Sequence, residues 1–234
     1  MFRPRSLTSI SFFFPCYNEA LNIGSMIEQA VQVGEAYGAD YEVVVVDDGS
    51  RDDSAEVIQR YAKENPRVRL VSHDFNQGYG TALRTGFQSV TKDLVFMADG
   101  DDQFRVADIE KLFAKIDGCD VVTGYRLKRQ DGPLRRLNGR LWTWLNRTLF
   151  DLPVRDVDCA FKLLRRKCLA GVELKSKQLL IHSELLARLK KKGCKIQEIG
   201  VDHYPRTRGK ASATGLGRIF KTFSELLRLY RDIR

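Results

Sequence analysis

The sequence lacks the signals of membrane-spanning, secreted and zinc-binding proteins. No apolar run approaches the ~20 residues that cross a bilayer, and no apolar signal-peptide segment follows Met1-Phe2-Arg3-Pro4-Arg5. The five cysteines form no CxxC pair, so the sequence indicates neither a zinc site nor a disulfide framework. We therefore expect a cytoplasmic protein with reduced thiols, whose contact with any membrane is peripheral.

Two common nucleotide-binding signatures are also missing. The sequence contains no GxxxxGK(S/T) motif, which argues against a P-loop. Gly78-Tyr79-Gly80 is only a fragment of GxGxxG, and it does not directly follow the first apolar strand. We therefore discount both the P-loop and the dinucleotide-binding fold.

Positive charge, by contrast, is in excess. The 234 residues include 39 Lys and Arg against 30 Asp and Glu, a formal net charge of +9. This excess implies an anionic partner: nucleic acid, an acidic membrane surface or a phosphorylated substrate. No helix-turn-helix, zinc or RNP pattern appears, so we do not expect nucleic acid to be the partner. A basic nucleic-acid-binding domain is the alternative from a different functional class.

Apolar runs alternate with helical patterns along the first half of the chain. We expect strands at residues 9–14, 41–46, 68–72 and 119–124, and another in the apolar run that starts at Leu94. Helical periodicity fills the intervals between them. This order predicts an α/β fold with a mostly parallel, doubly wound sheet and right-handed crossovers. The length is that of one domain.

Two of these strands end in carboxylates. Asp47-Asp48 follows one strand, and Asp99-Gly100-Asp101-Asp102-Gln103 follows the other. Because parallel strands present their carboxyl ends at one edge, we expect both acidic groups and the loop Pro15–Glu19 to open onto one crevice. A solvated acidic turn is the alternative interpretation.

The residue types of this crevice suit a nucleotide with a bound cation. Mg2+ takes one or two carboxylates and completes its shell with water and substrate phosphate oxygens. Asp101 and Gln103 can therefore hold a metal beside a diphosphate. Asp47 can accept a hydrogen bond from a base or ribose, and Tyr17 can pack on a ring.

The second half of the chain is basic and amphipathic. Within residues 125–155, leucines recur at helical spacing beside Trp142 and Trp144, with arginines around them. A second basic amphipathic helix is predicted at residues 216–233. Tryptophans flanked by arginines are typical of helices in a membrane interface, so we expect docking on a membrane surface. The alternative is that these apolar stripes face the protein core.

Four ordered motifs resemble those of the family 2 glycosyltransferases, which have the GT-A fold. They are Pro15-Cys16-Tyr17-Asn18-Glu19, Val46-Asp47-Asp48-Gly49-Ser50, Asn76-x-Gly78-x-Gly80 and Asp99-Gly100-Asp101-x-Gln103. Later segments are similar to the polyprenyl-phosphate (dolichyl-phosphate) mannose and glucose synthases. These are Gly124-Tyr125-Arg126, the basic amphipathic helix, Asp156-x-x-Cys159-Ala160-Phe161-Lys162 and Arg206-x-x-Gly209. The resemblance implies one GT-A domain over residues 1–234, with a nucleotide-binding half (1–124) and an acceptor and membrane-surface half (125–234).

The resemblance also implies a role for each motif residue. The nucleotide-sugar site would be formed by Pro15, Tyr17, Glu19, Asp47, Ala98, Asp99, Gly100 and Arg206. Asp99 would contact ribose, or the metal through water, whereas Asp101 and Gln103 would coordinate Mg2+ or Mn2+. Arg126 and Arg135 would hold the acceptor phosphate. The residues expected to carry catalysis are Asp99, Asp101, Arg126 and Asp156. Asp102 departs from the family pattern, which often has an apolar residue there.

The expected activity is metal-dependent, inverting transfer of a hexose from a nucleotide sugar to a polyprenyl or dolichyl phosphate at the cytoplasmic face of a membrane. GDP-mannose is the favoured donor and UDP-glucose the second candidate. A polyprenyl phosphate is ionised at neutral pH, because the second pKa of a phosphate monoester is about 6, so it needs positioning rather than a base. The alternative is a soluble family 2 enzyme with a saccharide hydroxyl acceptor. That acceptor would need a general base, for which Asp156 and Asp158 are candidates.

Overall fold

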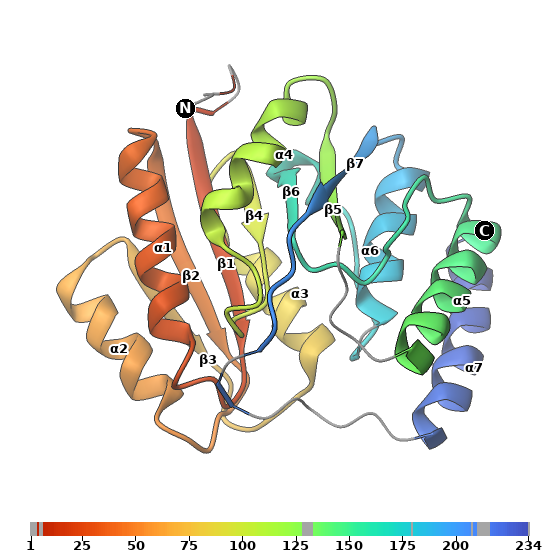
Figure 1. Ribbon diagram of the computed structural model, residues 1–234, viewed down its shortest axis with the longest axis horizontal. Helices are drawn as coiled ribbons and strands as arrows, with labels where there is room; N and C mark the ends of the chain where they lie inside the picture. Colours follow the sequence, from red (N-terminus) through yellow and green to blue (C-terminus); the bar gives the residue numbers. More distant parts are fainter. Residues whose placement is uncertain are drawn as a thin grey trace.

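The computed structural model of the protein has one sheet, to which the described residues contribute seven strands (Figure 1). Described are residue 4 and residues 7–127, 133–178, 180–206, 208–209 and 216–233, without the side chains of 133–138 and 216–224. The strands are β1 (Ser9–Cys16), β2 (Asp40–Asp47), β3 (Val68–Ser72), β4 (Leu94–Met97), β5 (Val121–Arg126), β6 (Lys162–Arg165) and β7 (Ile196–Val201). Their order in the sheet is β3-β2-β1-β4-β6-β5-β7, which confirms the expected α/β fold.

The sheet is parallel except at β6. β3, β2, β1 and β4 run in one direction, and β5 pairs in parallel with β7. β6 lies antiparallel between β4 and β5, with Lys162 at its start opposite Met97 at the end of β4. β6 therefore enters the sheet at the edge where β4 leaves it. This places the segment before β6 at the same rim as the loops that follow β1, β2 and β4.

Helices cover both faces of the sheet. α1 (Ile23–Ala36), α2 (Ser54–Glu64) and α4 (Ile109–Ile116) pack on one face, and α3 (Tyr79–Ser89) and α6 (Leu180–Lys191) on the other (Figure 1). Phe12 and Phe14 of β1 join the first core layer, whereas Phe13 joins the second, because successive side chains of a strand point to opposite faces. The short 3-10 helices are η1 (Val106–Asp108) and η2 (Arg166–Leu169).

The two basic amphipathic helices, α5 (Pro133–Phe150) and α7 (Leu216–Ile233), lie beside α6 (Figure 1). The apolar side chains of α5 divide into two groups. Trp142 and Phe150 pack against core residues, whereas Leu141 and Trp144 are 55% and 64% exposed. The apolar stripe of α5 thus serves the core and also presents large apolar groups to the outside.

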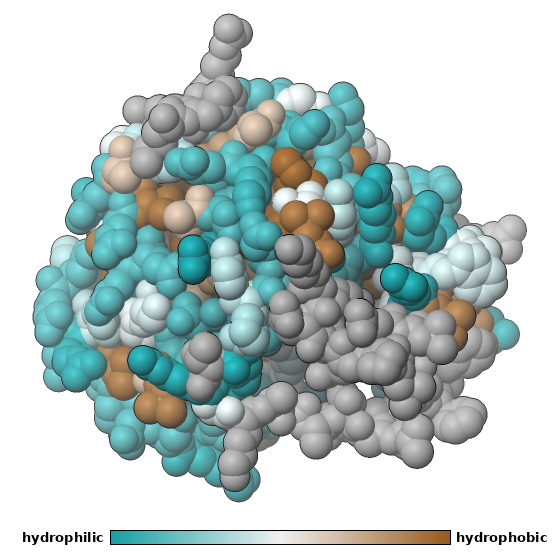
Figure 2. All heavy atoms as spheres, viewed as in Figure 1, coloured by the Kyte–Doolittle hydropathy of each residue, from teal (hydrophilic) through white to brown (hydrophobic). Residues whose placement is uncertain are grey.

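The coloured surface in Figure 2 is predominantly polar. On the face in Figure 2, hydrophobic residues among the coloured atoms occur in small groups separated by hydrophilic ones. Among the helices that the structure describes, none has the length and apolar content needed to cross a membrane.

Candidate nucleotide and metal site

The carboxylate of Asp48, at the end of β2, is committed to the protein itself. Its side chain accepts hydrogen bonds from the backbone N–H groups of Gln77 and Gly78, both at 2.9 Å, and contacts Nδ1 of His73 at 2.7 Å. Gly78 has φ +99°, and a Cβ there would lie 2.7 Å from the Lys177 carbonyl oxygen. Asp48 therefore anchors the turn before α3, rather than facing the crevice beside Asp47 as the sequence suggested.

Asp47, its neighbour, keeps a local partner at the rim. Ser50 donates to its carboxylate from both the hydroxyl, at 2.5 Å, and the backbone N–H, at 3.3 Å. Burial raises the pKa of Asp47. The Ser50 hydroxyl also accepts from the Asn18 N–H at 2.9 Å, while the Asn18 side chain accepts from the Arg51 N–H at 2.8 Å. These bonds join the loops after β1 and β2, and Tyr17 in the first of these loops is partly exposed.

The turn after β4 approaches the β1 loop closely at Gly100. A Cβ at this position would lie 2.8 Å from the Pro15 carbonyl oxygen, so a larger residue would push the two segments apart. Pro15 and Ala98, on either side of this approach, are buried. The two acidic strand ends and the Pro15–Glu19 loop thus share one rim, as predicted.

Arg206, from the segment after β7, joins this rim electrostatically. Its guanidinium donates to Glu19 at 2.6 Å and to Asp101 at 3.3 Å. The Asn22 side chain donates to the second oxygen of Glu19 at 2.7 Å. Burial raises the pKa of Glu19 even though Arg206 opposes this effect. Two residues predicted for the nucleotide-sugar site, Glu19 and Arg206, therefore form one cluster of alternating charge with Asp101, a predicted metal ligand.

The Asp101–Gln103 loop is fixed on both sides. The Gln103 amide donates to the Tyr204 carbonyl at 3.1 Å, and the Tyr204 N–H donates to the Gln103 carbonyl at 2.9 Å. Asp102, at φ +59°, accepts from the side chain of Gln29 in α1 at 3.0 Å. This contact gives Asp102, the residue that departs from the family pattern, a structural partner in α1. Asp101 instead faces the rim.

Asp99 is held by residues that sequence reasoning missed. The Tyr79 hydroxyl donates to Asp99 Oδ1 at 2.7 Å, and His182 Nε2 lies 3.0 Å from the same hydroxyl. Burial, followed by the charge of Asp101, raises the pKa of Asp99 to about 6. Burial and the charges of Lys162 and Arg126 lower the pKa of His182 far below its usual value, so the imidazole is neutral. No local sequence pattern links these three positions.

The acceptor side of the rim is organised by an ion pair between two of the predicted residues. Asp156, before β6, receives two hydrogen bonds from the guanidinium of Arg126 at the end of β5, at 2.6 and 2.8 Å. Asp158 accepts from the indole N–H of Trp142 at 3.2 Å. Burial and the charge of Asp156 raise the pKa of Asp158 to about 6. The side chain of Arg135 lies outside the described residues.

The donor set suits a hard divalent cation that is shared with a substrate. Among the described residues there is no group of three or more His, Cys, Asp and Glu side chains arranged as a metal cage. Asp101 instead offers one carboxylate, and the 3.3 Å contact with Arg206 shows that this carboxylate attracts a cation. Mg2+ and Mn2+ are commonly bound in this way, with diphosphate oxygens and water completing the shell. Asp101 and the amide oxygen of Gln103 therefore fit the predicted role.

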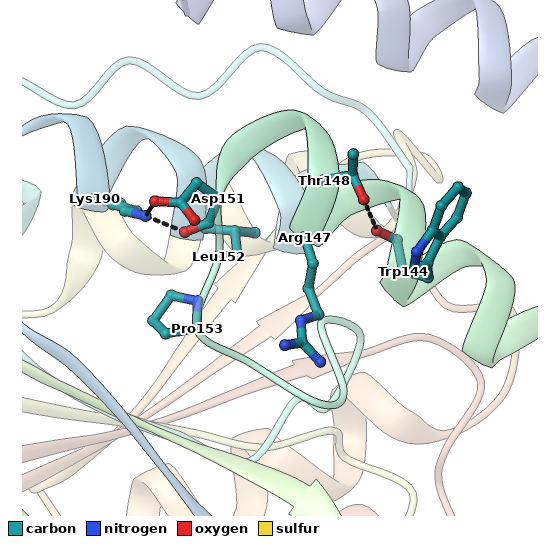
Figure 3. Close-up of a pocket in the computed structure, with 7 residues that line it drawn as sticks. All are labelled: Trp144, Arg147, Thr148, Asp151, Leu152, Pro153 and Lys190. Atoms are coloured by element: carbon teal, nitrogen blue, oxygen red, sulfur yellow. Dashed lines mark hydrogen bonds and ion pairs between the residues drawn. The ribbon is translucent and has the colours of Figure 1, made fainter.

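A separate hollow of about 530 Å3 lies between α5 and α6 (Figure 3). It is lined by Trp144, Arg147, Thr148, Asp151, Leu152, Pro153 and Lys190. Lys190 is paired with Asp151 within it. None of these residues belongs to the acidic rim, so the hollow belongs to the helical, basic part of the molecule.

The comparisons with known proteins agree with this geometry. The family model "Glycosyl transferase family 2" matches residues 11–171, which include the carboxyl ends of β1, β2 and β4 and the start of β6, while Arg206 lies beyond the match. The chain belongs to this family. Solved structures with a similar fold include that of glucosyl-3-phosphoglycerate synthase from Mycobacterium tuberculosis in complex with Mn2+ and UDP-glucose. Its TM-score is 0.70 and its sequence identity 17%, and the match covers 97% of this chain and 79% of that one. Mannosyl-3-phosphoglycerate synthase from Rubrobacter xylanophilus gives TM-score 0.69 at 14% identity, over 96% and 73%.

Curated relatives of this glycosyltransferase include undecaprenyl-phosphate 4-deoxy-4-formamido-L-arabinose transferases. That of Shewanella sediminis is 33% identical over 69% of this chain and 50% of its own length. That of Edwardsiella ictaluri is 30% identical over 95% of this chain and 68% of its own length. The chain spans about half the length of the first two such relatives.

Proposed function

We propose that this family 2 glycosyltransferase transfers a sugar from a nucleotide sugar to a polyprenyl phosphate at a membrane surface, with Mg2+ or Mn2+ as cofactor. The observation that carries the proposal is the shared rim. It brings the Glu19–Arg206–Asp101 cluster and the Arg126–Asp156 pair to the ends of adjacent strands. The names of the relatives, which act on undecaprenyl phosphate, support the acceptor class.

On the donor side, residues of the chain bind the nucleotide and neutralise the charge of its diphosphate. Asp47, oriented by Ser50, accepts from the base or ribose, and Tyr17 packs on the ring. Arg206 lies beside Asp101, where it can donate to the leaving diphosphate. When bound at Asp101 and Gln103, the metal would neutralise charge that develops on that diphosphate, which is typically the largest electrostatic contribution to such a reaction.

On the acceptor side, the geometry favours a phosphate over a hydroxyl. Both oxygens of Asp156 receive hydrogen bonds from Arg126, so this carboxylate orients the guanidinium rather than standing free as a base. Arginine held in this way is suited to an anionic oxygen. A phosphate that is already ionised needs only this positioning. Asp158 stays the candidate base if the acceptor is a saccharide hydroxyl.

The membrane contact is proposed for α5 and its surroundings. Leu141 and Trp144 are exposed there, and Arg147 lies in the neighbouring hollow (Figure 3). Exposed tryptophan beside arginine suits the boundary between headgroups and acyl chains. The acceptor's lipid tail would then remain in the bilayer while its phosphate reaches Arg126.

The donor sugar is the least constrained part of the proposal. GDP-mannose was favoured from the sequence and stays a prediction. The curated relatives are named for a different sugar, 4-deoxy-4-formamido-L-arabinose. UDP-linked and GDP-linked donors must therefore be tested side by side.

The test combines nucleotide binding with transfer. The purified protein is titrated calorimetrically with GDP and with UDP, each in MnCl2 and in EDTA, and then assayed with GDP- and UDP-sugars on undecaprenyl phosphate in anionic vesicles. We expect metal-dependent binding of one nucleotide and sugar transfer to the lipid. Arg126→Ala should abolish transfer but not nucleotide binding. Arg155→Ala, which removes a 66% exposed arginine paired with Glu198, is the matched control and should retain both. Transfer only to a water-soluble saccharide would overturn the acceptor assignment.

A further inference from the structure

We infer that Tyr79 and His182 are positioning residues for Asp99, and that through them helix α6 of the acceptor half sets the orientation of a donor-site carboxylate. The inference rests on the proposed function and extends it to two residues that the family motifs do not specify. Tyr79 occupies a variable position of Asn76-x-Gly78-x-Gly80, and His182 lies outside the motifs. Tyr79 begins α3, Asp99 follows β4 and His182 lies in the first turn of α6. Three elements therefore meet in one hydrogen-bonded chain.

The direction of each hydrogen bond in this chain is set by chemistry. An ionised carboxylate only accepts, so the Tyr79 hydroxyl donates its single proton to Asp99 Oδ1 at 2.7 Å. The Tyr79 oxygen must then accept from His182 Nε2–H, at 3.0 Å. The rings of Tyr79 and His182 also pack together, with centroids 5.5 Å apart. His182 is thereby assigned the neutral tautomer with its proton on Nε2.

The burial of His182 makes this chain rigid. The residue is 1% exposed, and its Nδ1 has no hydrogen-bond partner among the described residues. The Nε2 contact with Tyr79 is consequently the one described polar contact that fixes the ring. An imidazole nitrogen buried without a partner costs free energy, so a gain in stability does not explain this arrangement.

The consequence falls on Asp99. Tyr79 occupies one of its oxygens, and no described residue donates a hydrogen bond to Oδ2. A carboxylate held at one oxygen presents the other in a fixed direction, and we place a metal-bound water there. Without the Tyr79 hydroxyl the carboxylate can rotate and lose this direction. The expected defect is therefore in metal-dependent nucleotide binding, not in nucleotide binding as such.

The experiment measures the affinity for UDP and GDP, whichever the wild type binds, by calorimetry in MnCl2 and in EDTA. We expect Tyr79→Phe to weaken the affinity in MnCl2 roughly tenfold, the usual effect of losing a hydrogen bond to a charged group, and to leave the affinity in EDTA unchanged. His182→Leu should show a smaller loss of the same kind. His182→Gln, whose amide can donate from the position of Nε2, should restore most of it. Ser183→Ala, a buried neighbour on α6, is the matched control. An unchanged Tyr79→Phe, or equal losses in both conditions, would overturn the inference.

Two further measurements separate this inference from the proposed function. In the double variant Tyr79→Phe/His182→Leu, the loss of nucleotide affinity in MnCl2 should not exceed that of Tyr79→Phe alone, because both changes break the same hydrogen-bonded chain. Additive losses of affinity would contradict the inference. The nitrogen-15 spectrum of the histidines, with His182 assigned through His182→Gln, should show the Nε2–H tautomer. An Nδ1–H tautomer would overturn the inference even in a protein that binds no nucleotide. Absent nucleotide binding with an Nε2–H tautomer would instead count against the proposed function.

Discussion

The two acidic strand ends of this molecule share a sequence pattern but differ in what surrounds them. After β2, Asp48 receives two backbone N–H bonds and a histidine contact, and Asp47 receives two bonds from Ser50. After β4, Asp101 accepts from the Gln103 N–H at 3.2 Å and from the Arg206 guanidinium at 3.3 Å, and Asp99 accepts from one hydroxyl. At the β2 end every carboxylate oxygen accepts a hydrogen bond from the protein. At the β4 end no described residue donates to Asp99 Oδ2, and one oxygen of Asp101 faces a cation. The residues around each pair of carboxylates, and not the carboxylates themselves, therefore distinguish the structural β2 end from the proposed ligand site at the β4 end.

Among substitutions at these two acidic strand ends, the largest effect on nucleotide binding and transfer is expected at Asp101. Asp101→Ala removes the only carboxylate assigned to the metal, so metal-dependent nucleotide binding and transfer should fall by about 100-fold or more, in the range seen when one electrostatic stabiliser is lost. Asp102→Asn alters the adjacent carboxylate, which contacts α1, and should keep the metal dependence. Calorimetry in MnCl2 and EDTA measures both. Mn2+-dependent affinity that survives in Asp101→Ala would remove Asp101 from the site.

At the β2 end the corresponding substitution should destabilise the fold rather than abolish nucleotide binding. Asp48→Ala leaves the Gln77 and Gly78 N–H groups buried without an acceptor, which should cost about 3 kcal/mol of unfolding free energy. The protein that remains folded should bind nucleotide with metal dependence. Urea unfolding followed by circular dichroism gives the stability. Asp74→Ala, an exposed residue in the same segment, serves as control. A stable Asp48→Ala that has lost nucleotide binding would place Asp48 in the site instead.

The stability contributed by the β4 end should also depend on pH. The pKa of Asp99 is raised to about 6, so the native state binds this proton more tightly than the unfolded chain. The unfolding free energy of the wild type in EDTA should therefore fall as pH rises from about 4 to about 6, relative to Asp99→Asn, which has no such proton. Unfolding curves at several pH values test this. A constant difference between the two proteins across that interval would show that Asp99 titrates normally.

The smallest effect is expected at Ser50. Ser50→Ala removes one hydroxyl that donates to Asp47 and accepts from the Asn18 N–H. Nucleotide affinity should weaken by about 1 kcal/mol, a few-fold, and equally in MnCl2 and EDTA, because Asp47 is assigned to the base or ribose and not to the metal. Ser89→Ala, in α3, should change neither. A loss confined to MnCl2 would mean that the two acidic ends are not separate in function.

The sequence predicted where the site residues gather better than how each side chain is used. Parallel strands must bring the segments after β1, β2 and β4 to one edge, so the convergence of Glu19, Asp47 and Asp101 followed from the order of apolar runs. That same order says nothing of rotamers. It could not show that Asp48 turns to the loop before α3 and Asp102 to α1.

Contacts from distant elements were beyond sequence reasoning for a different reason. His182 reaches Tyr79 because α6 packs on the face that α3 covers, and no local periodicity encodes which helices meet. Likewise, the antiparallel insertion of β6 brings Asp156 to Arg126, and a short apolar run does not reveal its direction. Helix and strand positions depend on local pattern, whereas these pairings depend on packing.

The reversed direction of β6 has a consequence for how the connection between β5 and β6 can vary in length. β5 ends and β6 begins side by side, with Thr123 opposite Lys162 and the Gly124 N–H bonded to the Phe161 carbonyl at 2.7 Å. All of the chain between them, α5 and the Asp156 loop included, is topologically one hairpin connection. Lengthening such a connection costs little closure entropy. The segment proposed to bind the acceptor can therefore vary in length between related proteins while the strands of the sheet keep their register.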